Sequence, residues 1–397
     1  MIDYYLVMRG FNFNAVIVYP LIAVLFVWSI KFILIKRNDF IVSLLNVFLI
    51  YNLLSIVAYF FNNTPIDCYI GSFRNFIFPF IFAYFGYHYS DDYLFNKMYI
   101  YGCVFCFLIG LYLYFTLPPY YVDFLTQAEK ADILNDGTVI ISRFGSFFGG
   151  SYAISFFSVP CLALSMSYLL NKKCEIKRWV LYLAVFSSFL AAILCQQRIA
   201  MACSILILMF YTLKLIFKGG KKLVIYFILT IVVVLVSSRF LQSESGDITS
   251  NQLINRFENM SFTAAMSSRI GQYTSFDRDT PLSHVVGLGM GSCGHIAHSL
   301  GLKCIADGDY IRIFHENGVL GFSIFLFLVL MTLIKLFKNH RILHAEGCII
   351  LFFLASMIGA NPLEYFLFSV MFWFTLGHIW NPRFRKKIKQ DISDTKS

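Results

Sequence analysis

Long apolar stretches separated by short polar connections dominate the chain. A helix needs about 20 mostly apolar residues to cross a bilayer, and eleven stretches approach this length. They are 15–35, 40–61, 70–89, 98–117, 147–170, 178–195, 199–217, 222–239, 317–337, 345–360 and 363–380. This pattern predicts an all-α polytopic integral membrane protein, forming a single membrane domain over residues 1–397. Eleven transmembrane helices are expected, or twelve if a further first helix restores an even number.

Two connections are much longer than the others, and we expect both on the same side of the membrane. They cover residues 118–146 and 240–316. Long connections in a compact protein are usually functional or disordered. The second is rich in glycine and aromatic residues, so we expect it to carry short helices that lie on the membrane face.

The basic residues predict the orientation of the chain. Of the 32 lysines and arginines, 21 lie at one set of helix ends and connections or in the C-terminal tail, which the positive-inside rule makes cytoplasmic. The formal charge of +10 is therefore a topology signal and does not indicate nucleic-acid binding. With 58% hydrophobic and only 14% charged residues, the composition also excludes an ordinary soluble enzyme.

The opposite, outward side uses arginine where the cytoplasmic side uses mostly lysine. Positive charge there opposes the topology rule, and arginine is suited to bidentate contact with phosphate or carboxylate. Each arginine could instead pair with an outward acid, but the whole set favours an anion site. The nine outward arginines are Arg9, Arg74, Arg143, Arg198, Arg239, Arg256, Arg269, Arg278 and Arg312.

Arg198 and Arg143 stand at helix ends. Arg198 lies in a very short turn, CQQRIAM, between two apolar helices. A guanidinium so near the hydrocarbon is costly without a partner, so it either extends to the interface or faces a polar cavity. Arg143 begins RFGSFFGGSYA, where the glycines allow close approach of a helix or a ligand.

The segment 267–321 concentrates the remaining candidate chemistry. Asp309, Arg312 and Glu316 follow i, i+3, i+7 spacing and share one helix face. They form either a salt-bridged stripe or a carboxylate base beside an arginine that holds an anion. A flexible turn is predicted before them, at Gly287, Gly289, Gly291 and Gly294.

Nucleotide and metal sites are not predicted in this segment. The GLGMGS run lacks the Lys-Ser/Thr pair of a phosphate loop. His295 and His298 form an HxxH pair without an evident third ligand, although His298 is a candidate for proton transfer. Cys293 and Cys304 share the long connection and could pair if that side is periplasmic.

Three patches together resemble the O-antigen polymerase and ligase superfamily of bacterial inner-membrane glycosyltransferases. They span about 140–325 and are RFGSFFGGSYAISFFSVPCLAL, the short turn with Arg198, and SSRIGQYTSF…PLSHVVGLGMGS…DGDYIRIFHENGVLGF. The weight lies in their order and in the topology, because no single patch is specific.

The resemblance implies an enzyme that acts at the periplasmic face on glycans carried by undecaprenyl diphosphate, without nucleotide sugar, metal or other cofactor. Its partners would be this lipid-linked glycan and the bilayer, with a chain-length regulator as a further candidate. Arg198 and Arg269 match the family arginines that hold the donor diphosphate, and Arg143 matches the arginine of the earlier connection. Arg312 is a further candidate for this role.

The ligase signature carries His-Asn or His-Ser before the Asp-Tyr-like helix, whereas this chain has Asp307 and Gly308. The difference favours a polymerase of oligosaccharide repeat units over a ligase and leaves the base open among Asp309, Asp307 and His298. A lipid-linked oligosaccharide flippase and a structural partner of glycan synthesis are the alternatives from other classes. The late, long connection argues against a transporter built from two matched halves.

Overall fold

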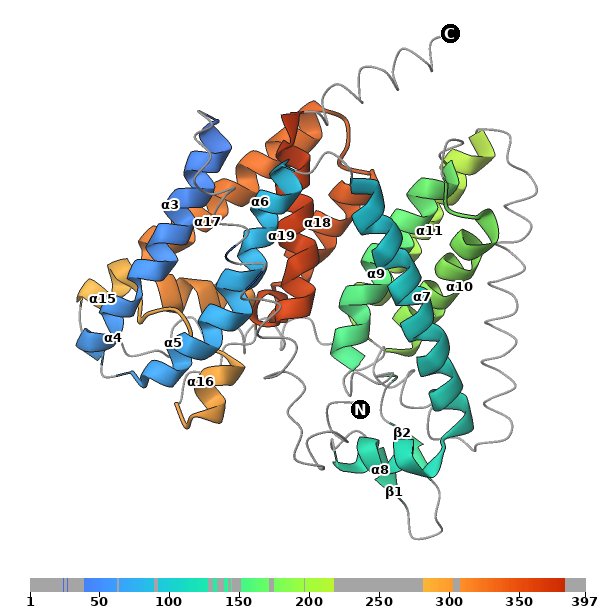
Figure 1. The fold of residues 1–397 in the computed structure, drawn as a ribbon, viewed down its shortest axis with the longest axis horizontal. Helices are drawn as coiled ribbons and strands as arrows, with labels where there is room; N and C mark the ends of the chain where they lie inside the picture. Colours follow the sequence, from blue (N-terminus) through green and yellow to red (C-terminus); the bar gives the residue numbers. More distant parts are fainter. Residues whose placement is uncertain are drawn as a thin grey trace. The chain divides into compact units, whose positions relative to one another are not determined.

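In the computed structural model the chain forms two compact units (Figure 1). One unit comprises residues 1–4 and 96–268, and the other 5–95 and 269–397. The residues described are 24, 27, 39–62, 64–88, 92–127, 131–133, 139–141, 144, 151–170, 175–195, 197–217, 281–302 and 308–382.

In its described residues the first unit contains helices and one small hairpin, with α7 starting just before the unit boundary. Its elements are α7 (Asp92–Thr116), α8 (Pro119–Gln127), β1 (Ala131–Ile133), β2 (Val139–Ile141), α9 (Ser151–Leu170), α10 (Arg178–Leu194) and α11 (Arg198–Phe217). The strands pair antiparallel, with Ala131 opposite Ile141. Thus the predicted connection 118–146 carries a short helix and a hairpin in its described part.

The regular elements in the described residues of the second unit are all helices, joined by loops and turns. Its elements are α3 (Phe40–Leu54), α4 (Ile56–Asn62), α5 (Ile66–Ser72), the π-helical turn η2 (Phe73–Ile77), α6 (Phe78–His88), α15 (Pro281–Val286), α16 (His295–Ser299), α17 (Asp309–Lys338), α18 (Ala345–Ser356), the 3-10 turn η4 (Pro362–Glu364) and α19 (Phe366–Trp380). The short helices α15 and α16 fall in the described part of the connection 240–316.

Four helical segments are long and apolar enough to cross a membrane, among the residues that the structure describes. They are Phe40–Asn62, Leu94–Thr116, Tyr152–Leu170 and Asp309–Lys338. The chain is therefore helical and compatible with a membrane protein. Predicted stretches 15–35 and 222–239 lie largely or wholly outside the described residues, whereas the other nine coincide with helices.

The predicted start of the ninth apolar stretch, at 317, lies beside a break in α17. The element runs from Asp309 to Lys338, but its backbone is non-helical at Gly318. The polar turns before the break, with Asp309, Arg312 and Glu316, are helical, as their spacing predicted.

Aromatic rings around Trp373 form the centre of the second unit. Its indole lies 4.7 Å from the ring of Phe80, 6.0 Å from that of Phe76 and 6.1 Å from that of Phe48, measured between centroids. Helices α6 and α19 approach each other closely because Gly86 and Gly377 leave no side chain between the backbones. Small residues serve this purpose in membrane helix pairs.

Proline inside α9 is compensated by a neighbouring helix in the first unit. Pro160 has no N–H, so the carbonyl of Phe156 loses its usual donor one turn later. The Tyr99 hydroxyl of α7 donates to this carbonyl at 3.4 Å and to that of Phe157 at 3.3 Å. Freed carbonyls of this kind must find donors within the protein if a helix is to cross a bilayer.

Helix α17 is broken at Gly318, where φ is 61° and ψ is −170°. The break deprives the preceding carbonyls of their donors, and other elements replace them. Leu288 N donates to His315 O at 2.9 Å, and Gly289 N donates to Glu316 O at 2.9 Å. The Tyr51 hydroxyl donates to Asn317 O at 2.6 Å.

The loop 287–294 is packed rather than flexible, contrary to our expectation. Its four glycines all have positive φ, between 84° and 99°, a region that side chains disfavour. A Cβ at Gly287 would meet the Glu316 carbonyl, and one at Gly291 would meet the Cys68 carbonyl. A Cβ at Gly289 would lie 2.5 Å from the Tyr59 ring. Glycine is used here for close approach.

Cys293 in this loop is disulfide-bonded. The partner that we considered from the sequence, Cys304, lies outside the described residues. The other cysteines that the structure describes form no disulfide bond: Cys68, Cys103, Cys106, Cys161, Cys195, Cys203 and Cys348.

We predict that Gly318→Ala lowers the free energy of unfolding by about 1–3 kcal/mol, because alanine disfavours positive φ. Its Cβ would also overlap Val285 O. The matched control is Gly102→Ala in α7, where nothing lies within 4 Å of the added Cβ. There alanine should be neutral or stabilise by about 0.5–1 kcal/mol. Thermal unfolding of both proteins in detergent measures the difference, and equal melting temperatures would contradict the prediction.

Candidate functional site

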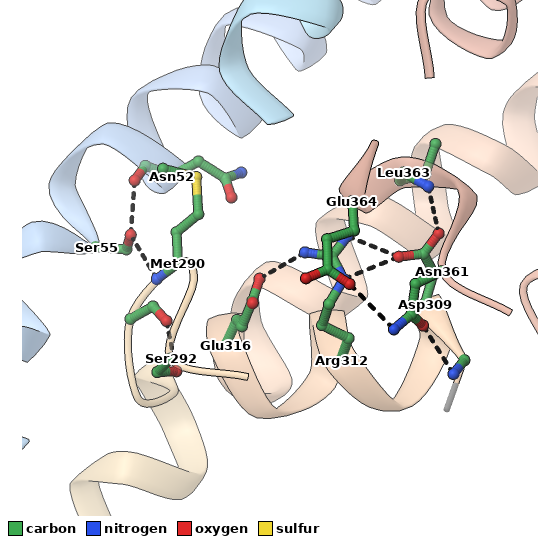
Figure 2. A network of polar contacts seen from close by, with 12 residues as sticks. Asn52, Ser55, Met290, Ser292, Asp309, Arg312, Glu316, Asn361, Leu363 and Glu364 are labelled. Atoms are coloured by element: carbon green, nitrogen blue, oxygen red, sulfur yellow. Dashed lines mark hydrogen bonds and ion pairs between the residues drawn. The ribbon is translucent and has the colours of Figure 1, made fainter. Parts of the chain in front are cut away.

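Four charged side chains meet in the interior of the second unit, at the N-terminal end of α17 (Figure 2). Asp309, Arg312 and Glu316 come from α17, and Glu364 comes from η4. Their exposed fractions are 0%, 1%, 2% and 3%. Charged groups are almost never buried so completely unless they are paired, so this cluster is the best candidate site in the described part of the chain.

Arg312 is held between the two acids on its own helix. Its Nε and Nη2 donate to Asp309 Oδ1 at 2.9 and 2.7 Å, and its Nη1 donates to Glu316 Oε2 at 3.0 Å. The guanidinium also lies 5.7 Å from the centroid of the Phe76 ring. Of the two alternatives raised by the spacing, the salt-bridged stripe is therefore present.

The connection between α18 and α19 forms hydrogen bonds with the start of α17. Asp309 Oδ2 accepts from Leu363 N at 2.6 Å, and Asp309 N donates to Ala360 O at 3.0 Å. Asn361 Oδ1 accepts from Gly308 N at 2.8 Å. The polar first turn of α17 is thus fully engaged by a segment some 50 residues later.

Glu316 and Glu364 occupy the sides of the cluster. Glu316 Oε2 binds Arg312, and the backbone N–H of Gly291 in loop 287–294 also approaches the Glu316 carboxylate. Glu364 Oε2 accepts from Asn361 Nδ2 at 3.2 Å. The loop 287–294 packs closely against Glu364. A Cβ added at Gly294 would lie only 2.7 Å from Glu364 Oε1.

The negative charge of the cluster also acts on Cys68, on α5. Burial raises the pKa of the Cys68 thiol, and the nearby negative charges of Asp67 and Glu316 raise it further. Cys68 is therefore a neutral thiol at physiological pH.

Among the described residues, three carboxylates face one guanidinium, and the Nε, Nη1 and Nη2 atoms of Arg312 all donate to carboxylates. Three of the five N–H groups of the guanidinium are thus engaged within the protein, and in this arrangement Arg312 stabilises the fold. Asp309 is likewise occupied, with hydrogen bonds on both oxygens.

The other predicted site residues are distributed differently. Arg198 is exposed and begins α11 in the first unit. His298 is exposed on α16, and its neighbour His295 lies 6.0 Å from the Tyr365 ring. Asp307, Arg143 and Arg269 lie outside the described residues.

Our sequence reasoning missed Glu364 and Asn361. A signal was available, because Glu364 is the only Asp, Glu, Lys or Arg in the predicted stretch 363–380. An ionisable residue inside an apolar segment is by default a candidate for function or for a buried partner. The Asn-Pro pair at 361–362 also marks the turn that brings it to α17.

Comparison with known proteins does not assign the chain to a family. Neither protein-family models nor curated proteins match it. The fold therefore defines the class, a helical protein with apolar helices suited to a membrane.

We predict that Arg312→Ala lowers the free energy of unfolding by about 3–5 kcal/mol, because it leaves buried carboxylates unpaired. The control is Arg341→Ala, whose partner Glu346 lies 4.0 Å away on a partly exposed face. That change should cost about 1 kcal/mol or less. Denaturation in detergent measures both, and a similarly small effect at Arg312 would contradict a structural role for the cluster.

Proposed function

We propose that this protein is a membrane glycosyltransferase that polymerises oligosaccharide repeat units carried on undecaprenyl diphosphate, at the outward face of the bacterial inner membrane. The ordered sequence patches and the apolar helical fold support the proposal. The structural observation that carries it is Arg198, an exposed guanidinium between two apolar helices. A diphosphate at a membrane surface is a suitable ligand for such a group.

In the proposed reaction, a hydroxyl of the acceptor repeat attacks the anomeric carbon of the donor. The new C–O bond forms as the bond to the diphosphate breaks, and the configuration inverts. Undecaprenyl diphosphate leaves with its charge stabilised by arginines, of which Arg198 and Arg269 are the candidates. A side-chain base takes the hydroxyl proton.

The buried cluster has a positioning role in this proposal. Asp309 and Arg312 are occupied by each other and by the α18–α19 connection, so they hold the start of α17 in place. The base is then sought at Asp307 or at His298, the second of which is exposed.

The break in α17 favours a second candidate, a transporter of lipid-linked oligosaccharide. Discontinuous helices with polar groups at their broken ends often form the substrate sites of transporters. Gly318 interrupts an otherwise apolar helix beside the buried charges. A ligase within the same superfamily is the third.

Deleting the gene in its host and separating the lipopolysaccharide on a gel tests these candidates. Core carrying a single repeat, without the longer ladder, is expected for a polymerase. Core without any repeat would contradict the polymerase and indicate failed export or ligation. An unchanged ladder would overturn the assignment to O-antigen.

The arginine role is tested in the same host by the double variant Arg198→Ala, Arg269→Ala. We expect it to be present at normal abundance and to lose the ladder, because the leaving diphosphate is no longer stabilised. Arg178→Ala is the matched control, since Arg178 is also exposed and also begins an apolar helix, but on the predicted cytoplasmic side. An intact ladder in the double variant would refute the diphosphate contact.

A further inference from the structure

Helix α7 carries a continuous apolar stripe on the surface of the first unit. The side chains in the stripe are three or four positions apart along the chain, so they share one face of the helix. Their exposed fractions range from 41% to 68%, and they are Met98, Tyr101, Phe105, Leu108, Tyr112 and Phe115. Large exposed apolar surfaces mark sites of contact with a membrane or a partner.

The uncharged segment that contains this stripe is longer than one crossing of a bilayer requires. Between Lys97 and Asp123 the sequence has no Asp, Glu, Lys or Arg. From Met98 to Thr116, where α7 ends, the helix is about 27 Å long at about 1.5 Å per residue. This length nearly equals the hydrocarbon thickness of about 30 Å. Residues 117–122 are therefore not needed for the crossing.

The chain turns at the point where the crossing is complete. Leu117 N still donates to Leu113 O at 3.0 Å, but Leu117 has a φ of 44°, which ends the helix. Pro118 O then accepts from Tyr121 N at 2.8 Å in the first turn of α8. Only residues 117 and 118 separate the two helices, and one residue spans at most about 3.6 Å. Helix α8 is therefore held at the depth where α7 ends (Figure 1).

Helix α8 has a packed face and an exposed face. Tyr121 and Phe124 are buried, with ring centroids 6.4 Å apart. Tyr120 is 45% exposed, and Asp123 is exposed one turn later. Tyr120 lies between these two faces, because Phe124 is four positions and Asp123 three positions after it. An apolar ring with a polar hydroxyl at such an edge suits the boundary between lipid and water.

We propose that α8 is an interfacial helix, lying in the phospholipid headgroup region on the predicted outward side of the bilayer. Tyr112 and Phe115 at the end of α7 and Tyr120 on α8 form one aromatic belt at this level, while Asp123 faces water. Tyrosine is enriched at membrane–water interfaces, and amphipathic helices bind there in the plane of the membrane. The inference does not depend on the proposed glycosyl transfer.

Two other occupants of these rings fit the structure less well. A sugar would need polar groups that fix its orientation, but Thr116, the polar side chain between Phe115 and Tyr120, donates its hydroxyl to Tyr112 O at 2.7 Å. A second copy of the chain could cover the stripe on α7. It would not explain why the chain turns after the length of one crossing.

The proposal also gives the first long connection a position. Helix α8 contacts β1, and β1 pairs with β2. With α8 in the headgroup region, this hairpin is held close to the membrane surface. The connection 118–146 would then begin at the level of the phospholipid phosphates.

Photo-crosslinking of the full-length protein in nanodiscs of phosphatidylethanolamine and phosphatidylglycerol tests the proposal. The photoreactive residue p-benzoylphenylalanine replaces Tyr120 in one variant and Asp123 in the matched control on the same helix. After irradiation, the intact mass should show a phospholipid adduct in several-fold higher yield at position 120 than at position 123. Replacement of Tyr112 should give a yield similar to that at position 120.

Several outcomes would overturn the assignment. They are equal phospholipid yields at positions 120 and 123, no phospholipid adduct at 120, and a crosslinked dimer in place of the lipid adduct. In host membranes, a saccharide adduct at 120 without phospholipid would identify a glycan surface instead. If the substituted Tyr120 variant does not fold, Tyr120→Trp replaces it. Brominated phospholipid should quench the fluorescence that this tryptophan adds to wild type, and unquenched added fluorescence would refute the contact.

Discussion

The hydrogen-bonded ion pairs of Arg312 are the interaction on which the second unit depends. The guanidinium joins Asp309 and Glu316 along one face of α17, and the far oxygen of Asp309 accepts from the α18–α19 connection. Removing one partner of such a buried network costs far more than the intact network gains, because the remaining charges stay in the interior. The network therefore determines where α17 begins and which segment covers it.

The broken helix and the glycine loop form one structural unit with this network. A break in an apolar helix leaves carbonyls that need donors, and loop 287–294 supplies two of them. The loop approaches closely enough because glycine replaces side chains at the contacts. Its own position is further defined by Tyr59, whose hydroxyl donates to Met290 O. The same principle appears in the first unit, where Tyr99 serves the carbonyl freed by Pro160.

The candidate site residues are of two kinds: some are buried and hydrogen-bonded to other protein groups, and others are exposed. Arg312 and Asp309, which the sequence suggested for ligand binding and catalysis, are occupied by protein partners. Arg198 and His298 are exposed and remain the described candidates for contact with a substrate. This division gives the charged cluster a structural role in holding the start of α17.

The sequence by itself determined the helical class and most helix positions, because apolar stretches of membrane length are a local property of the chain. It also determined that Asp309, Arg312 and Glu316 share a face, since helical spacing requires no tertiary information. It did not determine which alternative that face would adopt. Only the tertiary structure brought Glu364, Asn361 and Leu363 to α17, because their contacts join segments about 50 residues apart. Loop 287–294 likewise looked like a flexible turn, and only its packing against Tyr59, Cys68 and Glu316 made its glycines structural.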